Sequence, residues 1–440
     1  MAKSKKPEVM KLNCLVIGAG DRGTLFGTIA ANYGAKVVAV ADTSTKMREL
    51  MAERHDIPIE MMFESGKQAL NSGLPFDVVY IATPDKTHYK LGRLALEKGY
   101  NVLLEKPMAL KPNQCINLIK AQQKAGKNLT ICHVLRYSPF FQTIKAIADS
   151  QELGKIVSIN LTEDVGYWHF AHSYVRGNWR KESESAPIVL AKSSHDLDII
   201  AWLANSTPLT IFSNGSLNIF KKENAPKTSS DRCIDCPIKD CLYDARKFYL
   251  NHKPPVTWPY TVISPEDTSE EGRLSAITGG PYGRCVFKCD NDVLENQDVL
   301  IEFDNGVKAN FSLRFGGEST SRKVNIQFER GEISGNLSRG KINKIAYVGR
   351  RKEGEVEEIA TGELGGHGGG DSVLIKNLFE SIRSQNYKES LTSAEQSLQS
   401  HLIGFAAEMS RKAGKQGRVI DFKRYLKDKG VKISGSKKGE

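Results

Sequence analysis

The fold is indicated first by the stretch from Leu12 to Asp42, which reads LNCLVIGAGDRGTLFGTIAANYGAKVVAVAD. An apolar run, a glycine-rich turn, a helix-length segment and a second apolar run follow one another in it. Gly18 permits a tight turn out of the first strand, Gly20 lets a ligand approach the backbone, and Gly23 lets a helix pack closely on that strand. The stretch therefore predicts a strand, a turn, a helix and a second strand.

The same stretch has the properties of a dinucleotide site. Free N–H groups at the start of the helix favour a pyrophosphate. Asp42 lies about 20 residues beyond the glycines, where a carboxylate can accept hydrogen bonds from both ribose hydroxyls, and this favours NAD over NADP. Arg22 leaves some room for a 2′-phosphate. The expected cofactor is NAD, with NADP less favoured.

The composition indicates a globular chain of two or three domains. Its 440 residues are 40% hydrophobic, and no apolar run reaches the roughly 20 residues that span a bilayer. Residues 1–6 lack the apolar segment of a secretory signal, so a cytoplasmic protein is expected. The net charge of +11 is scattered along the chain, so we expect neither a nucleic-acid nor a membrane partner.

Strand-like and helix-like segments alternate through the first third of the chain. Strand-like runs at 76–82, 101–104 and 129–134 are separated by helix-like segments near 88–98 and 113–125. Such alternation builds a parallel sheet with crossover helices. We therefore expect an α/β Rossmann domain, a doubly wound parallel sheet, at residues 1–135.

Beyond about residue 155 strand-like runs follow one another directly. They lie at 156–162, 209–220, 297–303, 307–314, 323–328 and 342–348, and helix-like segments at 371–384 and 391–413 follow. This pattern predicts an α+β domain with an open, largely antiparallel sheet at residues 136–425. A cysteine-rich insertion is expected at about 221–295 and a flexible tail at 426–440.

Glu105-Lys106-Pro107 follows a predicted parallel strand directly. Ligands of such sheets bind beyond the carboxyl ends of the strands. A lysine there can reach a substrate hydroxyl, and Pro107 restricts the backbone that carries it. The alternative is an ordinary surface lysine after a strand.

Three motifs together resemble the glucose-fructose oxidoreductase, inositol dehydrogenase and MocA family. They are the Gly18–Gly23 turn, Thr83-Pro84 followed by His88, and Glu105-Lys106-Pro107. The resemblance implies an NAD(P)-dependent oxidoreductase of sugars, cyclitols or glycosides, with its active site between a Rossmann domain and an open-sheet domain. It makes Lys106 the catalytic lysine. The cofactor-binding residues it indicates are Gly18, Gly20, Asp21, Arg22, Gly23, Asp42, Thr83, Pro84, His88, Glu105 and Lys106.

The resemblance also implies a histidine at the start of a helix in the second domain, where this chain has His195. His195 and Asp198 lie three residues apart, on one helix face, and we expect both to be catalytic with Lys106. Many relatives carry an acid four residues before the histidine, but this chain has Ala191, with Lys192 beside it as a substrate-binding candidate. His195 could share general acid/base work with Lys106.

A polar and aromatic segment between residues 163 and 180 is the predicted sugar site, because aromatic faces stack on sugars and polar groups fix their hydroxyls. Its candidate residues are Trp168, His169, His172, Arg176 and Trp179. The alternative is a dimer interface or a core loop. His367, in a run of glycines, is a further substrate-binding candidate, and Asp371 after it is either a site residue or a helix N-cap.

Five of the eight cysteines lie in the insertion. They are Cys233, Cys236, Cys241, Cys285 and Cys289. Clustered cysteines in a cytosolic chain indicate metal more often than disulfides, so four of the five are expected to hold structural zinc. An iron–sulfur cluster, or no metal, are the alternatives. Cys14, Cys115 and Cys132 lie in apolar patterns and are expected in the core.

The sequence therefore predicts an NAD-dependent oxidoreductase that acts on a hydroxyl of a sugar, cyclitol or glycoside. Lys106 would take the hydroxyl proton with help from His195. Two alternatives stay open: a glycoside hydrolase that uses bound NAD for transient oxidation at C3, and a catalytically silent NAD-binding sensor. A homodimer or homotetramer is expected, because the sheet of the second domain would leave one face exposed.

Overall fold

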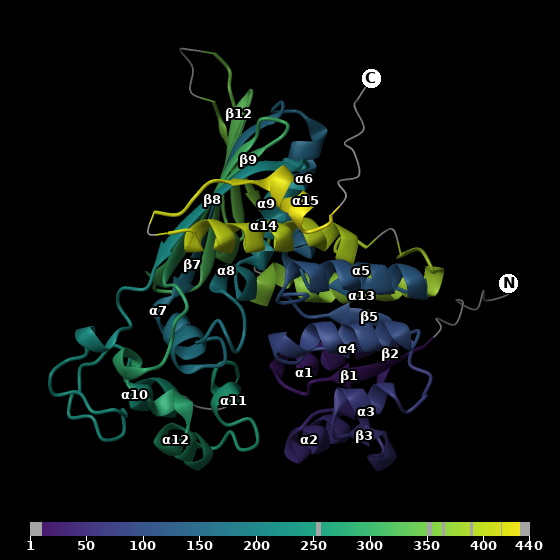
Figure 1. The fold of residues 1–440 in the computed structure, drawn as a ribbon, viewed down its shortest axis with the longest axis vertical. Helices are drawn as coiled ribbons and strands as arrows, with labels where there is room; N and C mark the ends of the chain where they lie inside the picture. Colours follow the sequence, from purple (N-terminus) through teal and green to yellow (C-terminus); the bar gives the residue numbers. More distant parts are fainter. Residues whose placement is uncertain are drawn as a thin grey trace, which may run out of the picture. The chain divides into compact units, whose positions relative to one another are not determined.

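The computed structural model describes residues 11–251, 257–349, 354–362, 366–387, 390–414 and 416–431. The chain forms two compact units (Figure 1). Of the described residues, the first unit takes those within 11–109, 117–132 and 371–396. The second takes those within 110–116, 133–370 and 397–431.

The first unit contains a six-stranded parallel sheet. Its strand order is β3 (Met62–Phe63), β2 (Ala35–Ala41), β1 (Leu12–Ile17), β4 (Val78–Ile81), β5 (Asn101–Leu104) and β6 (Leu129–Ile131). Every residue of β4 and β5 is buried, as expected for a parallel sheet covered on both faces. Strand order reverses between β1 and β4, which is where such sheets bind ligands. The doubly wound sheet predicted from the sequence is confirmed.

Six helices accompany this sheet. They are α1 (Asp21–Asn32), α2 (Thr45–His55), α3 (Gly66–Leu70), α4 (Asp85–Glu97), α5 (Pro112–Ala125) and α13 (Gly370–Ser384). Helix α13 is far from the others in sequence, but its Phe379 ring lies 6.3 Å from the Phe26 ring of α1. The Arg383 guanidinium donates to the carbonyls of Tyr33 and Gly34 at 2.8 and 3.0 Å. The compact units therefore differ from the single division after residue 135 that the sequence indicated.

The second unit contains a nine-stranded mixed sheet. Its order is β14 (Val356–Ala360), β13 (Lys341–Ala346), β12 (Gly331–Asn336), β11 (Ser321–Phe328), β7 (Ile156–Gly166), β10 (Lys308–Gly317), β9 (Asn296–Phe303), β8 (Pro208–Ser216) and β15 (Ile420–Asp421). Strands β7 and β10 are parallel, and the other neighbours are antiparallel. Burial alternates along β9 and β11, so one face packs on the core and the other is open, as predicted.

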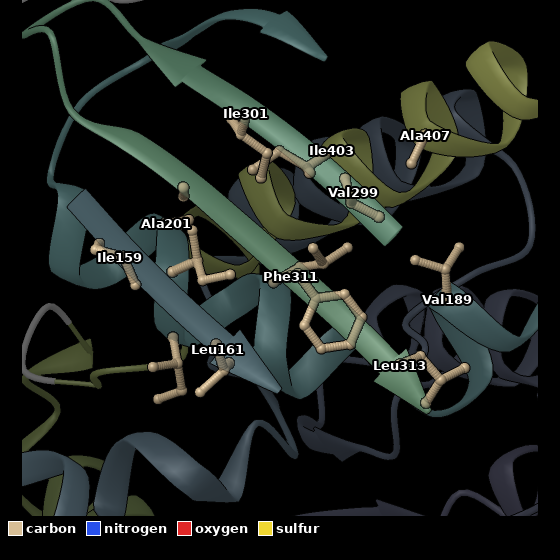
Figure 2. Close-up of a cluster of buried hydrophobic side chains, with 14 of the residues drawn as sticks. Ile159, Leu161, Val189, Ala201, Val299, Ile301, Phe311, Leu313, Ile403 and Ala407 are labelled. Atoms are coloured by element: carbon tan, nitrogen blue, oxygen red, sulfur yellow. The ribbon is translucent and has the colours of Figure 1, made fainter. Parts of the chain in front are cut away.

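Helices cover the inner face of this sheet. They include η2 (Val134–Tyr137), α6 (Pro139–Ser150), α7 (Tyr167–Phe170), η3 (Ala171–Arg176), α8 (Ile188–Ala191), α9 (Ser194–Ala204) and α14 (Ala394–Lys412). Figure 2 shows Leu161, Phe311 and Val299 of the sheet with Ala201 of α9 and Ile403 of α14 in one buried cluster. This apolar core holds α14 and α9, and α9 carries the candidate site residues His195 and Asp198.

The insertion between β8 and β9 has a small core of its own. It contains α10 (Ala245–Leu250), α11 (Tyr260–Ile263) and α12 (Glu270–Gly279). Tyr249, Ile263, Ile277 and Tyr282 are buried together in it. The insertion is thus held by packed aromatic and aliphatic side chains.

The predicted flexible tail, 426–440, overlaps the end of the last helix in the structure. Helix α15 (Phe422–Asp428) continues past residue 426, with Asp421 capping it through the N–H of Arg424 and with Tyr425 and Leu426 buried. The expected tail at 432–440 lies outside the described residues. None of the described helices is long and apolar enough to cross a membrane.

Candidate active site

The glycine turn after β1 has the geometry that each glycine predicted. Gly18 has a φ of +97°, and a Cβ there would lie 2.5 Å from the carbonyl oxygen of Ala82 at the end of β4. A Cβ on Gly23 would lie 1.9 Å from the carbonyl oxygen of Gly18, so α1 packs directly on the turn. A Cβ on Gly20 would meet no described atom within 4 Å. The turn is therefore open only at Gly20, the N-cap of α1.

Asp42 follows β2 at the same edge of the sheet. Its Oδ2 accepts the N–H of Ala19 at 2.8 Å and its Oδ1 accepts the N–H of Ser44 at 2.9 Å. Each carboxylate oxygen has a second lone pair, so Asp42 can hold the turn and still accept from ribose hydroxyls. The open Gly20, the N-terminus of α1 with Asp21 in its first turn, and Asp42 fit a dinucleotide.

Arg22 is paired with two carboxylates. Its Nε lies 2.6 Å from Oε1 of Glu105 and its Nη2 lies 2.8 Å from Oδ1 of Asp371. Tyr80 donates to the same Glu105 oxygen at 2.7 Å. Burial would raise the pKa of Glu105, but Arg22, Tyr80 and Lys106 outweigh it and hold that pKa below its ordinary value. Arg22 thus ties the glycine turn to the end of β5, and two acids already neutralise its charge.

His88 links the turns that follow β4 and β5. Its Nδ1 lies 2.8 Å from the carbonyl oxygen of Pro107 and its Nε2 lies 2.7 Å from that of Thr83. Pro84, between them, is the N-cap of α4. The buried His88 therefore holds the backbone on both sides of the site. Lys106, partly buried, follows β5 within the segment that this link fixes.

In the second unit, Asp198 belongs to a buried cluster that the sequence only partly predicted. Arg136 of η2 donates to Asp198 through Nε and Nη2 at 2.6 and 2.8 Å. Burial would raise the pKa of Asp198, but Arg136 and His133 hold it below its ordinary value. The ring of His195, 4% exposed, stands 5.8 Å from that of His133. His133 and Arg136 were missed, although both follow β6 at the strand end where site residues are expected.

The ring of His367 lies 5.5 Å from that of His195. The glycines around it have a structural reason, because Gly368 and Gly369 have φ of 61° and 76°. A Cβ on Gly370 would lie 2.1 Å from the carbonyl oxygen of Val134. The glycine run thus brings His367 and His195 together within this unit.

Lys192 lies in a buried network of four charges. Its Nζ is 3.4 Å from Glu163, and Arg322 binds both Glu163 and, at 2.7 Å, Asp196. Burial lowers the pKa of Lys192, against the opposite charge of Glu163. Burial raises the pKa of Asp196, against Arg322. Glu163, fully buried, supplies an acid beside Lys192.

The sequence contains a signal that could have located Glu163 and Arg322. They pair directly across β7 and β11, at positions where the alternation otherwise points apolar side chains inward. Opposite charges at inward positions of two predicted strands indicate a buried ion pair. The sequence does not indicate which strands are neighbours, and so it does not identify the partners.

The predicted sugar segment divides into two parts. Trp168 and His169 are partly buried, and Nδ1 of His169 lies 2.8 Å from the Thr320 hydroxyl. His172 is buried, with Nδ1 2.8 Å from the Tyr249 hydroxyl, and burial together with Arg176 lowers its pKa to about 3.

Arg176 donates to the carbonyls of Arg284 and Tyr243 at 2.8 and 2.7 Å, and Trp179 packs against the main core. His172 and Arg176 thus anchor the insertion and Trp179 packs on the main core, as in the alternative of a core loop. Their contact with substrate stays a prediction.

The cysteine cluster does not form the predicted zinc site. All five thiols are free, and among the described residues no three His, Cys, Asp or Glu side chains are arranged to hold a metal ion. Four of them, Cys233, Cys236, Cys241 and Cys285, line one hollow of the insertion. Cys233 accepts a hydrogen bond from Arg176 at 3.4 Å, and Cys289 donates to the carbonyl of Cys285 at 3.4 Å. The packed core of the insertion supplies the cohesion that a metal was expected to give. Cys14, Cys115 and Cys132 are core residues, as predicted.

Two family models match most of the chain. Residues 12–133 match an oxidoreductase family with an NAD-binding Rossmann fold. Residues 145–419 match the C-terminal alpha/beta domain of the same oxidoreductase family.

Individual relatives are more distant. The chain is 25% identical over 317 residues to YteT of Bacillus subtilis (strain 168), which covers 69% of this chain and 72% of the relative. It is 30% identical over 193 residues to inositol 2-dehydrogenase 1 of Saccharopolyspora erythraea, covering 43% of this chain and 52% of that enzyme. The chain thus spans about half the length of that dehydrogenase.

A levoglucosan dehydrogenase solved with NADH and levoglucosan has a TM-score of 0.69 at 16% identity, covering 94% of this chain and all of the other. An oxidoreductase from Agrobacterium radiobacter solved with NAD+ has a TM-score of 0.68 at 15% identity, covering 95% of this chain and 100% of the other. These structural similarities concern the fold.

Proposed function

Because the chain belongs to the oxidoreductase family of glucose-fructose oxidoreductase, inositol dehydrogenase and MocA, we propose that it oxidises a secondary hydroxyl of a sugar, cyclitol or glycoside with NAD. The observation that carries this proposal is that three candidate residues lie at one edge of the parallel sheet in the first unit. The open Gly20, Asp42 and Lys106 all follow strands there. NAD, when bound, supplies the hydride acceptor.

The residues of the first unit divide the work in this proposal. Gly20 and the N-terminus of α1 would hold the pyrophosphate, and Asp42 the ribose hydroxyls. Arg22 would position Glu105 rather than bind a 2′-phosphate, since two carboxylates already pair with it. This pairing supports NAD over NADP. Thr83, Pro84 and His88 would form the rim of the cofactor site, and Lys106 would take the substrate proton.

The second unit supplies groups suited to sugar hydroxyls. His195 and His367 form an adjacent imidazole pair, and Lys192, next to Glu163, is a cation whose burial favours proton release. We propose that His195 assists Lys106, that Asp198 supports His195, and that Lys192 and His367 bind substrate. Trp168 and His169 are the aromatic candidates for a sugar face.

One experiment tests the central proposal. A panel of sugars and cyclitols is screened for NADH absorbance with the parent protein and with Lys106→Ala. Turnover should fall by at least about a hundredfold in the variant, because a general acid/base is lost, while NADH binding stays within about threefold. Equal turnover in the variant would remove Lys106 from the mechanism.

A glycoside hydrolase with transient oxidation at C3 is the second candidate. It is favoured by His367 in its glycine run, held beside His195. Cleavage of an aryl glycoside that requires NAD but accumulates no NADH would support it. Net NADH formation with a free sugar would support the dehydrogenase.

The remaining proposals concern assembly and location. We propose a homodimer or homotetramer formed by the open face of the nine-stranded sheet, where Val157 and Leu300 are 48% and 49% exposed. A cytoplasmic location agrees with free thiols in the insertion.

A further inference from the structure

Four of the nine histidines form one row of neighbouring rings in the second unit, of which only His133 and His401 are stacked face to face. The ring centroids of His401 and His133 are 5.2 Å apart, those of His133 and His195 5.8 Å, and those of His195 and His367 5.5 Å. His401 lies on α14, His195 on α9, and His133 just before η2. Tertiary packing alone brings these imidazoles together.

His133 has an unusual environment for a fully buried side chain. Its Nδ1 lies 3.1 Å from Oδ1 of Asp198, turned so that the contact is electrostatic rather than an aligned hydrogen bond. Its Nε2 has no hydrogen-bond partner among the described residues. A buried nitrogen without a partner costs stability, so its retention needs an explanation.

The charges around His133 suit a group that takes up and returns a proton. Asp198 faces it with a carboxylate, and Arg136 neutralises that carboxylate through two hydrogen bonds. His401 faces it from α14, but its Nδ1 is bound to the carbonyl of Ser397 at 2.8 Å. His195 faces it from α9, with His367 beyond.

We propose that His133 is a positioning residue for His195 that holds the proton His195 passes on during turnover. This inference rests on the proposed function. As the substrate C–H bond breaks, its hydride goes to NAD, and the O–H proton taken by Lys106 is passed on to one nitrogen of His195. The other nitrogen of His195 releases its proton to Nε2 of His133. His133 becomes an imidazolium beside Asp198, and the substrate becomes a carbonyl compound. Reduction runs the same transfers backwards.

Two variants distinguish a His133 that accepts a proton from a His133 that only fills space beside His195. His133→Asn keeps an amide near the position of Nδ1, facing Asp198, and removes Nε2. His133→Gln places its amide near Nε2 instead. Neither amide can accept a proton at neutral pH. His401→Asn is the matched control, since it removes a buried imidazole that packs on the same ring from α14.

The first readout needs no substrate. Proteins with ¹⁵N-labelled histidine are titrated by NMR, and the midpoint of His195 is compared. His133→Asn removes the nitrogen proposed to accept a proton from His195, so the midpoint should fall by about one pH unit. The amide oxygen of His133→Gln can still accept a hydrogen bond near that position, so its midpoint should stay closer to that of the parent protein. The control should leave it in place. An unmoved midpoint in His133→Asn, or an equal fall in His401→Asn, overturns the proposal.

The second readout is the pH profile of kcat. Both His133 variants should lose at least about tenfold in kcat, with KM within about threefold and the acid limb displaced. A loss in KM alone would overturn the relay. Should the parent protein turn over no sugar, the proposed function fails, while the NMR midpoint still decides whether His133 acts on His195.

Discussion

Replacing Gly23 by alanine tests how α1 is seated on the nucleotide turn. The new Cβ would stand 1.9 Å from the carbonyl oxygen of Gly18 and 3.1 Å from Cγ1 of Val16. Nonbonded atoms prefer about 3.5 Å, so the start of α1 would have to move by more than about 1 Å. Overpacking of this kind costs about 1–3 kcal/mol, and alanine returns up to about 1 kcal/mol through helix propensity.

Because the new Cβ meets backbone at 1.9 Å, the cost lies at the upper end of that range, about 3 kcal/mol. After the propensity gain the net cost is about 2 kcal/mol, which corresponds to a fall of about 4–8 °C in the melting temperature of the first unit. Gly20→Ala is the matched control, because its Cβ meets no described atom within 4 Å. We expect Gly20→Ala to lose less than about 1 kcal/mol of stability, since alanine is only a poorer N-cap. Its Cβ would nevertheless occupy the open side of the turn, so NADH affinity should fall at least tenfold, about 1.4 kcal/mol.

Calorimetric melting and NADH titration by isothermal calorimetry measure the two effects separately. The reasoning is refuted if Gly23→Ala melts with the parent protein. It is equally refuted if Gly20→Ala binds NADH with parental affinity, because the only open side of the turn would then not be the cofactor side.

Other predictions follow from the buried charges and from the open sheet. Asp198→Asn leaves Arg136 buried with a neutral partner, so the free energy of unfolding in urea should fall by about 3–5 kcal/mol; a loss below about 1 kcal/mol would contradict the buried pair. The folded pKa of Asp198 lies below its ordinary value of about 3.9, so its contribution is fully present above that pH and is lost as pH falls further, a dependence that Asp198→Asn should flatten. His172 has a folded pKa of about 3 against an ordinary 6.5, so stability of the insertion should fall as pH drops from 6.5 towards 3, by up to about 1.4 kcal/mol per unit. Melting of His172→Gln across this range should show a weaker slope, and an unchanged slope would assign the effect elsewhere. Leu300→Glu, on the open sheet face, should lower the mass measured by light scattering if that face joins two copies; an unchanged mass would place the interface elsewhere.

Much of the site in the first unit could be predicted because its residues lie at strand ends that the local pattern already locates. Gly18, Gly23 and Asp42 each have the geometry that their position after a strand indicated. The pairing of Arg22 with Glu105 could not be predicted, since 83 residues separate the two and only the strand order brings them together. Because of that pairing, Arg22 is no longer interpreted as a group near a 2′-phosphate. It instead connects the glycine turn with the segment that follows β5.

The structure does not support the zinc prediction, for a related reason. Spacing along the chain places thiols in one segment, but a metal site requires that the sulfur atoms converge. In the structure, Arg176 binds the sulfur of Cys233, and the insertion closes around its own aromatic core. Composition indicated a cluster, and packing decided that it would not converge on a metal.

The amino-acid order alone determined the strands, the helices and the glycine turn, because hydrophobic periodicity and backbone sterics act between residues a few positions apart. It also located Lys106 and His195 at the ends of their elements. Only the tertiary structure decided that Glu163 pairs with Arg322 across β7 and β11, that His133 stands between Asp198 and His195, and that α13 returns to the first unit. Contacts between residues so distant in sequence depend on strand register and on the path of the chain, and short-range patterns contain neither.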